Sequence, residues 1–187
     1  IPRPETELLV ERALAHVPPA ADWRLLDLGT GSGAIALALA HERPRARVIA
    51  VEQSAAALAV AERNRLALSL SNAELRQGSW YEPVSGERFH LIAANPPYIG
   101  EDEPEPQQGD ARFDPRTALI AGNAGLADLA HIIRLAPEHL YPGGLLALEH
   151  GYGQGEAVRA LLRAAELRDI ETLRDLQGHE RVSTARL

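Results

Sequence analysis

The sequence predicts a single α/β domain built on a mostly parallel central sheet with helices on both faces. Its 187 residues are 45% hydrophobic, which is enough to bury one substantial core. Short apolar runs of strand type alternate with helical patterns along most of the chain, and a glycine cluster joins the first such run to a helix. This alternation is typical of βαβ units, whose crossovers are almost always right-handed.

The first half of the chain supplies the regular part of this pattern. An acidic first turn at Glu5 to Glu7 and amphipathic spacing beyond it predict a helix that ends near Pro18 and Pro19. Strands are expected at residues 24–28, 47–51 and 73–76, the last of them weak, and helices at residues 34–41 and 55–68.

The second half is less regular. An apolar run at residues 89–94 predicts a buried strand that ends at Asn95, and residues 99–116 carry acids, prolines and glutamines without periodicity, as a surface loop would. Because it follows a strand end directly, this loop is where a lid over a substrate belongs. Further elements are helices at 126–140 and 154–165, a turn at 142–144, and strands at 145–149, 170–173 and 182–187, with a hairpin-like connection at 175–179.

Composition excludes several classes of function. The absence of cysteine rules out disulfides, thiolate zinc sites and a cysteine nucleophile. The seven histidines include no pair at the spacing of a metal site, so we predict no metal. A net charge of −7 opposes nucleic acid as a direct partner. No apolar run approaches the roughly 20 residues of a membrane helix and no signal peptide opens the chain, so we expect a soluble, cytoplasmic protein without a membrane partner.

The glycine cluster between the first strand and the next helix predicts a nucleotide-like ligand. Glycines let a backbone turn sharply and approach a ligand closely. Glu52, at the end of the second strand, can accept hydrogen bonds from both hydroxyls of an adenosine ribose. A dinucleotide and S-adenosylmethionine both remain possible, although the acid before the first glycine favours the latter. The residues of this candidate cofactor site are Asp27, Gly29, Thr30, Gly31, Ser32, Gly33 and Glu52.

The tetrapeptide Asn95-Pro96-Pro97-Tyr98 is the most specific feature of the chain. An amide or ring amine is a poor nucleophile because its lone pair is delocalised. The Asn95 side-chain oxygen and the Pro96 carbonyl can each accept one N–H of such a group and aim its lone pair at a methyl donor. Both prolines restrict φ, and the Tyr98 ring can stack on the flat group. We therefore expect Asn95, Pro96 and Tyr98 to act in catalysis and the whole tetrapeptide to bind substrate, with a glutamine amide, adenine or cytosine all admissible.

Three other residues are candidates with a structural alternative. Trp80 follows the third strand, where it could flank an adenine or simply belong to the core. Glu149 and His150 stand at the end of a strand, and a structural hydrogen bond is the favoured interpretation of both.

With these residues in hand, the sequence resembles the class I S-adenosylmethionine-dependent methyltransferases, and within them the release factor glutamine methyltransferase family. The resemblance covers essentially the whole chain. The segments that carry it are Pro2–Glu7, Asp27–Gly33, Asn95–Tyr98, Asp114–Leu119, Glu149–Gly151 and Gly178–Val182. It implies a Rossmann-like fold of about seven strands, the last of them antiparallel.

The resemblance also implies an activity: methyl transfer from S-adenosylmethionine to the side-chain amide nitrogen of the glutamine in the Gly-Gly-Gln motif of peptide chain release factors. By the same implication Gly29 to Gly33, Glu52, Trp80 and Asn95 contact the cofactor, while Asn95 to Tyr98 hold the glutamine. Glu52 stands where the family more often has aspartate. We expect residues 1–187 to form the catalytic domain, without the family's amino-terminal helical domain, and to act as a monomer.

Two alternatives remain at this point. The tetrapeptide would also suit a methyltransferase for an exocyclic amine of DNA or RNA, which the acidic charge opposes. The chain could otherwise be a noncatalytic module that binds the cofactor.

Overall fold

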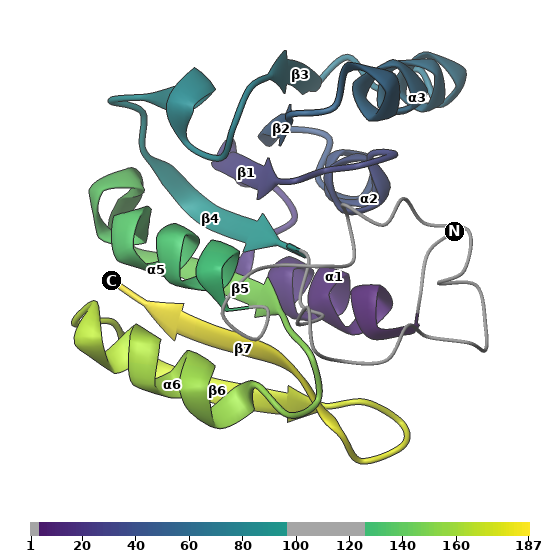
Figure 1. Cartoon of the computed structure of the whole chain (residues 1–187). Helices are drawn as coiled ribbons and strands as arrows, with labels where there is room; N and C mark the ends of the chain where they lie inside the picture. Colours follow the sequence, from purple (N-terminus) through teal and green to yellow (C-terminus); the bar gives the residue numbers. More distant parts are fainter. Residues whose placement is uncertain (1–3, 97–125) are drawn as a thin grey trace.

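A seven-stranded sheet forms the centre of the structure, a computed structural model that describes residues 4–96 and 126–187 (Figure 1). The strand order is β3-β2-β1-β4-β5-β7-β6. The strands are β1 (Arg24–Leu28), β2 (Arg47–Glu52), β3 (Ala73–Gln77), β4 (Phe89–Ala94), β5 (Leu140–Glu149), β6 (Arg168–Arg174) and β7 (Glu180–Arg186). Only β7 runs antiparallel to its two neighbours, while the other pairs are parallel. The expected sheet, with its last strand antiparallel, is confirmed.

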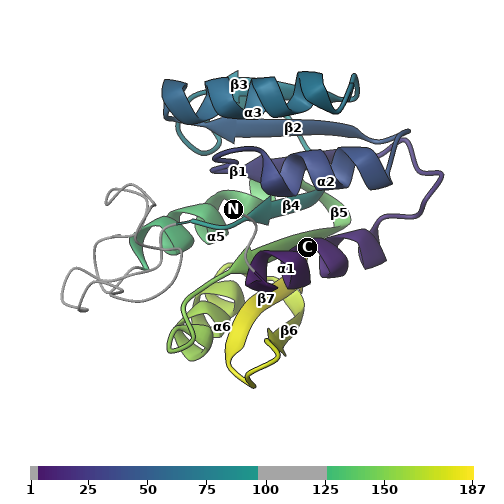
Figure 2. The ribbon, with the colours of Figure 1, turned by 90° about the vertical axis from the view of Figure 1, so that its right-hand side faces the viewer.

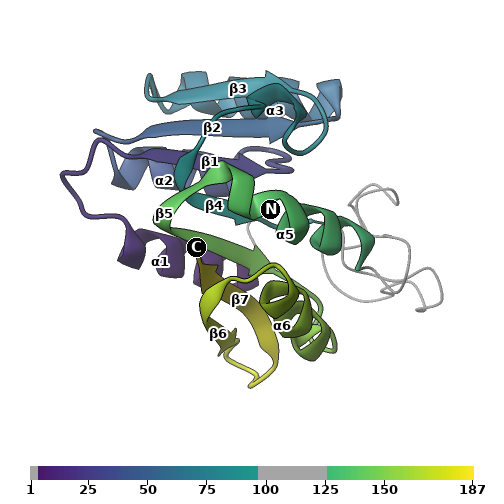
Figure 3. The ribbon, with the colours of Figure 1, turned by 90° about the vertical axis from the view of Figure 1, so that its left-hand side faces the viewer.

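Helices cover both faces of the sheet, as expected. One face carries α1 (Pro4–His16), α2 (Ala34–Glu42) and α3 (Ala55–Ala67), which lie in front in Figure 2. The other carries α5 (Ala127–His139) and α6 (Gly155–Ala164), which lie in front in Figure 3, and a short 3₁₀ helix, η1 (Glu82–Val84), follows β3. No helix in the described ranges is long and apolar enough to cross a membrane.

Alternate residues of the central strands pack into two separate cores. In β1, Leu26 and Leu28 contact the cluster that includes α5 and α6, while Leu25 belongs to the cluster that includes α1 and α2. All three leucines are fully buried. This two-sided burial explains why the central strands read as continuous apolar runs without alternation of polar and apolar residues.

The fold differs from the sequence-based expectation in one strand. Residues 142–144, expected as a turn, lie inside β5, where Pro142 and Gly143 are exposed. Leu140 already pairs with Phe89, and regular pairing resumes only between Leu145 and Leu91. The intervening residues therefore form an irregularity within one strand, since the chain pairs with β4 on both sides of it. The expected lid at residues 99–116 lies outside the described residues.

A chain of polar groups ties the last two strands to the centre of the sheet. Arg159 donates to the Thr172 hydroxyl at 3.1 Å, Thr172 and Ser183 lie 3.0 Å apart, and Ser183 lies 2.9 Å from His150 Nε2. The Gly151 carbonyl can only accept, so His150 donates to it from Nδ1 at 3.0 Å. Burial lowers the pKa of His150 and so favours the neutral ring, whose Nε2 then accepts the Ser183 proton, while Ser183 accepts from Thr172 and Thr172 from Arg159.

This arrangement predicts acid sensitivity. Burial is the main reason why the pKa of His150 lies below its ordinary value, with Arg159 and Arg181 adding to the shift and Glu180 opposing it. The unfolded chain takes up the proton more readily, so the contribution of His150 to the free energy of unfolding should fall as the pH drops below about 6.5. We expect His150→Gln to lose less stability than the wild type between about pH 8 and pH 5.5 in urea denaturation.

The exposed His41 provides the control, because His41→Gln should leave the pH dependence as it is in the wild type. His16 and His90, whose pKa values are also lowered by burial, remain in every variant and cancel in the comparison. An unchanged pH dependence in His150→Gln would show that this residue does not contribute.

Candidate active site

Residues from four neighbouring strands form one row at the carboxyl edge of the sheet. In the order of the strands β2, β1, β4 and β5, they are Glu52, Gly29, Asn95 and Glu149. The residues immediately before them pair with one another across the sheet, and in the same order these are Val51, Leu28, Ala94 and Leu148. Neighbouring strands lie about 4.8 Å apart, so the register alone brings the predicted cofactor and substrate residues together. This edge is where ligands bind in open α/β sheets.

The glycine loop turns the chain away from β1 at this row. The amides of Gly29 and Thr30 both donate to the Val51 carbonyl, at 2.9 and 3.0 Å. Gly29 and Gly31 have φ values of 70° and 56°, which side-chain-bearing residues rarely adopt. A Cβ on Gly31 would meet no atom of the described part of the chain within 4 Å, so these residues leave the space above the loop open. A ligand can therefore approach the backbone there.

Asp27 anchors the loop from inside the protein. Its Oδ2 accepts from the Thr30 hydroxyl at 2.5 Å and from the Ala36 amide at 3.1 Å, while its Oδ1 is buried and has no hydrogen-bond partner among residues 4–96 and 126–187. Burial raises the pKa of Asp27 to about 6, and the two hydrogen bonds only partly offset this effect. A buried acid with one unsatisfied oxygen fits a ligand that brings positive charge.

Glu52 connects the loop to the start of α3. One carboxylate oxygen accepts from the Gly31 amide and the other from the Ser54 amide, each at 2.8 Å. Ser54 in turn caps α3 by accepting from the Ala57 amide at 3.3 Å. Glu52 is partly exposed, and each of its oxygens keeps a second lone pair that can accept a ribose hydroxyl.

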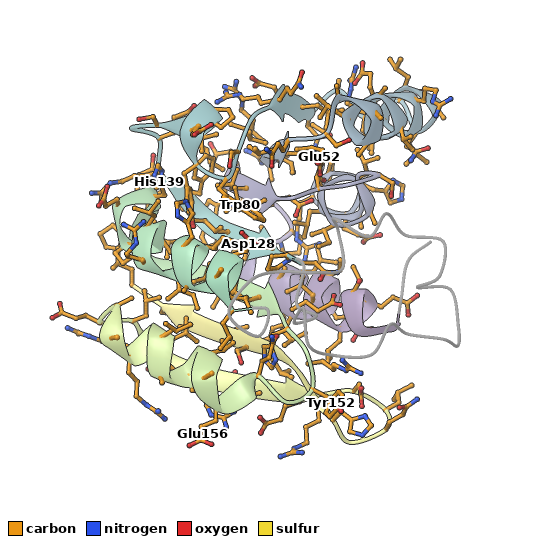
Figure 4. All side chains as sticks on the ribbon, in the orientation of Figure 1. Glu52, Trp80, Asp128, His139, Tyr152 and Glu156 are labelled. Carbon is orange, nitrogen blue, oxygen red and sulfur yellow. The ribbon has the colours of Figure 1, made fainter. Side chains whose placement is uncertain are left out.

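Trp80 lies over the glycine loop. A Cβ placed on Gly29 would lie 3.3 Å from the Trp80 ring, so the glycine allows this contact. Trp80 has a φ of 44°, and its side chain lies beside that of Asp128 of α5 (Figure 4). Burial raises the pKa of Asp128. Trp80 is thus partly buried against the core and also next to the site, while Asp128, in the first turn of α5, is a neighbour of the site that the sequence analysis did not identify.

Asn95 is held by two residues from elsewhere in the chain. Its Nδ2 donates to the Thr6 hydroxyl at 3.4 Å, and that hydroxyl donates to Glu149 at 2.9 Å. Asn95 is partly exposed, whereas Pro96 is buried. Thr6 lies in the Pro2–Glu7 segment that carries the family resemblance, but the sequence predicted no role for it in the site. Pro97 and Tyr98 lie outside the described residues, so their predicted roles stay predictions.

Comparison with known proteins shows the family to which this chain belongs. Residues 4–110 match the methyltransferase small domain family. The whole chain is 52% identical to the release factor glutamine methyltransferase of Salmonella typhimurium and spans 67% of that protein's length. The chain belongs to the release factor glutamine methyltransferase family.

Solved structures agree with this assignment. The release-factor-specific protein-(glutamine-N5) methyltransferase of Alicyclobacillus acidocaldarius is 29% identical, with a TM-score of 0.61, and the match covers 99% of this chain and 93% of that one. A 16S rRNA N2 G1207 methyltransferase from Thermus thermophilus, solved with AdoMet and guanosine, is 22% identical, with a TM-score of 0.70 over 100% of this chain and 43% of that one. The latter likeness shows the fold alone.

An open groove elsewhere on this methyltransferase is not its candidate site. The groove has a volume of about 710 Å³ and lies between α3 and β3, where Leu58, Glu62 and Leu75 are among its lining residues. None of the row residues lines it, and it lacks the glycine loop. In the described parts of the chain, no group of three or more potential ligands among His, Cys, Asp and Glu could hold a metal ion.

The buried Asp27 should make this domain less stable as the pH rises. Its carboxyl group, with a pKa of about 6, keeps a proton more readily in the folded than in the unfolded chain. Its contribution to stability is therefore full below about pH 4 and is lost as the pH rises through about 6. The free energy of unfolding of the wild type relative to Asp27→Asn should fall by about 2.5 kcal/mol between about pH 4 and pH 8.

Urea denaturation at a series of pH values measures this difference. Asp169→Asn is a matched control at an exposed position whose φ of 49° asparagine tolerates. A difference between wild type and Asp27→Asn that does not change with pH would contradict the prediction.

Proposed function

We propose that this methyltransferase transfers a methyl group from S-adenosylmethionine to the side-chain amide nitrogen of the Gly-Gly-Gln glutamine in peptide chain release factors. The observation that carries the proposal is the position of Asn95, which stands in one row with the glycine loop and Glu52. Among the described residues, no donor contacts its Oδ1, which is therefore available to a substrate amide. The name shared by relatives over the whole chain supports the choice of substrate.

The residues around the glycine loop suit the proposed cofactor. S-adenosylmethionine, when bound, would supply an electrophilic methyl carbon on a positively charged sulfonium. Glu52 would accept hydrogen bonds from the ribose hydroxyls, and the open space above Gly31 would admit a ligand against the backbone. Asp27 would gain a compensating positive charge, and Trp80 would lie beside the adenosine. These assignments extend to Thr30, Ser32 and Gly33, the other members of the loop.

On the substrate side, the protein has to localise a delocalised lone pair. Asn95 Oδ1 and the Pro96 carbonyl would each accept one N–H of the glutamine amide, so that both protons are held aside and the lone pair faces the methyl donor. Tyr98 would stack on the flat amide, and Pro97 would restrict the backbone between them. After transfer the nitrogen loses one proton to solvent, and positioning supplies the catalysis without a strong base.

The proposed partner is a protein and not a nucleic acid. The tetrapeptide would accept an exocyclic amine of DNA or RNA equally well, but the chain carries a net charge of −7, which opposes a polyphosphate. We further propose that the enzyme acts as a monomer in the cytoplasm.

The proposal is tested by methyl transfer from labelled S-adenosylmethionine to a release factor, using the full-length protein. Replacing Asn95 by Ala should lower kcat by at least about 100-fold, because it removes an acceptor needed in the transition state. Replacing the acceptor glutamine should abolish labelling. Label that appears in bare nucleic acid would favour the alternative methyltransferase, and cofactor binding without any transfer would indicate a noncatalytic module.

The role of Glu52 is tested by cofactor binding alone. In Glu52→Gln an amide N–H would replace an acceptor that faces backbone donors and the ribose, so we expect the Kd for S-adenosylmethionine to rise about 10- to 100-fold in calorimetry. Glu42→Gln removes an equal charge from the exposed end of α2 and should leave Kd unchanged. Equal Kd values for Glu52→Gln and the wild type would exclude the proposed ribose contact.

A further inference from the structure

Three residues that are distant in the sequence form a hydrogen-bonded chain at the edge of the sheet. Thr6 comes from the first turn of α1, Asn95 follows β4, and Glu149 ends β5. Asn95 Nδ2 lies 3.4 Å from Thr6 Oγ1, which lies 2.9 Å from Glu149 Oε2. We propose that Thr6 and Glu149 are positioning residues that set the orientation of the Asn95 amide for catalysis, an inference that rests on the proposed function.

The orientation follows from counting protons. A threonine hydroxyl has one proton and two lone pairs, and a carboxylate can only accept. Thr6 therefore donates its proton to Glu149 and can only accept from Asn95. The Asn95 side chain must turn its NH₂ group towards Thr6, which leaves Oδ1 as the acceptor for an N–H of the substrate.

The reverse orientation of the Asn95 amide would lose the hydrogen bond to Thr6 and also the one to the substrate. Asn95 Oδ1 would face the lone pairs of Thr6, and the NH₂ group would meet the N–H groups of the substrate amide as donor against donor. Without the Thr6 hydroxyl, nothing among the described contacts of the Asn95 side chain distinguishes the two orientations. Substrate binding would then have to select the productive one.

Rigid elements hold this hydrogen-bonded chain of Asn95, Thr6 and Glu149, the relay, in place. Glu149 is 1% exposed and Thr6 is 7% exposed, so water competes little for these hydrogen bonds. Asn95 and Glu149 stand side by side because the residues before them, Ala94 and Leu148, are paired in the sheet. Thr6 is fixed by α1, whose Leu9 is fully buried in the core. The positions of α1, β4 and β5 thus fix the orientation of the Asn95 side-chain amide.

The test compares Thr6→Val, which has the shape of threonine without its hydroxyl, with Thr6→Ser, which keeps the hydroxyl. Methyl transfer to a release factor is measured with the full-length protein, and the Kd for S-adenosylmethionine is measured by calorimetry. We expect Thr6→Val to lower kcat roughly 10- to 100-fold, the range typical when a partner that orients a functional group is removed. We expect Kd to change less than about twofold, and Thr6→Ser to keep kcat near the wild-type value.

Each result decides between positioning and a merely structural role. Equal kcat values for Thr6→Val and the wild type would overturn the proposal, as would a loss of kcat shared by Thr6→Ser. If the valine variant does not fold, Thr6→Ala is the second variant without a hydroxyl and should show the same loss. Failure of both to fold while serine folds would assign Thr6 to stability and count against the relay. A wild-type protein that transfers no methyl group would instead refute the proposed function.

Discussion

The parallel register of four strands is the constraint on which the site depends. Because β2, β1, β4 and β5 run in the same direction and are paired without offset near their carboxyl ends, the residues that follow them fall into one row. A shift of one residue in any pair would exchange the faces of that strand and bury a different set of side chains. The two cores specify this register, since the leucines of β1 must face alternately towards α1 and α2 and towards α5 and α6. The same packing that stabilises the sheet therefore aligns the candidate site residues.

Several features at this edge oppose stability and are held in place by their surroundings. Asp27 is fully buried with one unsatisfied oxygen, and Trp80 adopts a φ of 44° that is unfavourable for a large side chain. Both are fixed by neighbouring elements: Asp27 accepts from the Ala36 amide at the start of α2, and Trp80 packs against the hydrophobic core. Unfavourable local structure persists where the rest of the fold determines it, and it is concentrated at functional sites. The glycine loop is also locally unusual, because Gly29 and Gly31 adopt positive φ values. At Gly31 the backbone borders space that the described residues leave open and that a side chain would fill.

Much of the fold and part of the site could be predicted from the sequence, and the division has a physical cause. Strands that are buried on both faces appear in the sequence as apolar runs. Glycines or an Asn-Pro-Pro-Tyr segment directly after such a run indicate a ligand site at the end of the strand. Glu52 and Asn95 could therefore be placed at strand ends. Thr6 and Asp128 could not, because their contacts depend on how helices pack on the sheet, and nothing local marks a residue that meets another far away in the sequence. The irregularity in β5 has the sequence of a turn for the same reason, because only the pairing of Leu140 with Phe89, which is distant in the sequence, makes residues 142–144 part of the strand.

The relay also explains why an amide suits position 95 better than a carboxylate. An aspartate there could accept both N–H groups of a substrate, but it would have no donor for Thr6, whose only proton already goes to Glu149. It would also place a second negative charge about one strand spacing from Glu149, in a row that already contains Glu52. Asparagine avoids both conflicts, because it donates to Thr6 and its oxygen would accept from the proposed substrate without adding charge. A reaction that needs a fixed acceptor and no strong base is consistent with such a residue.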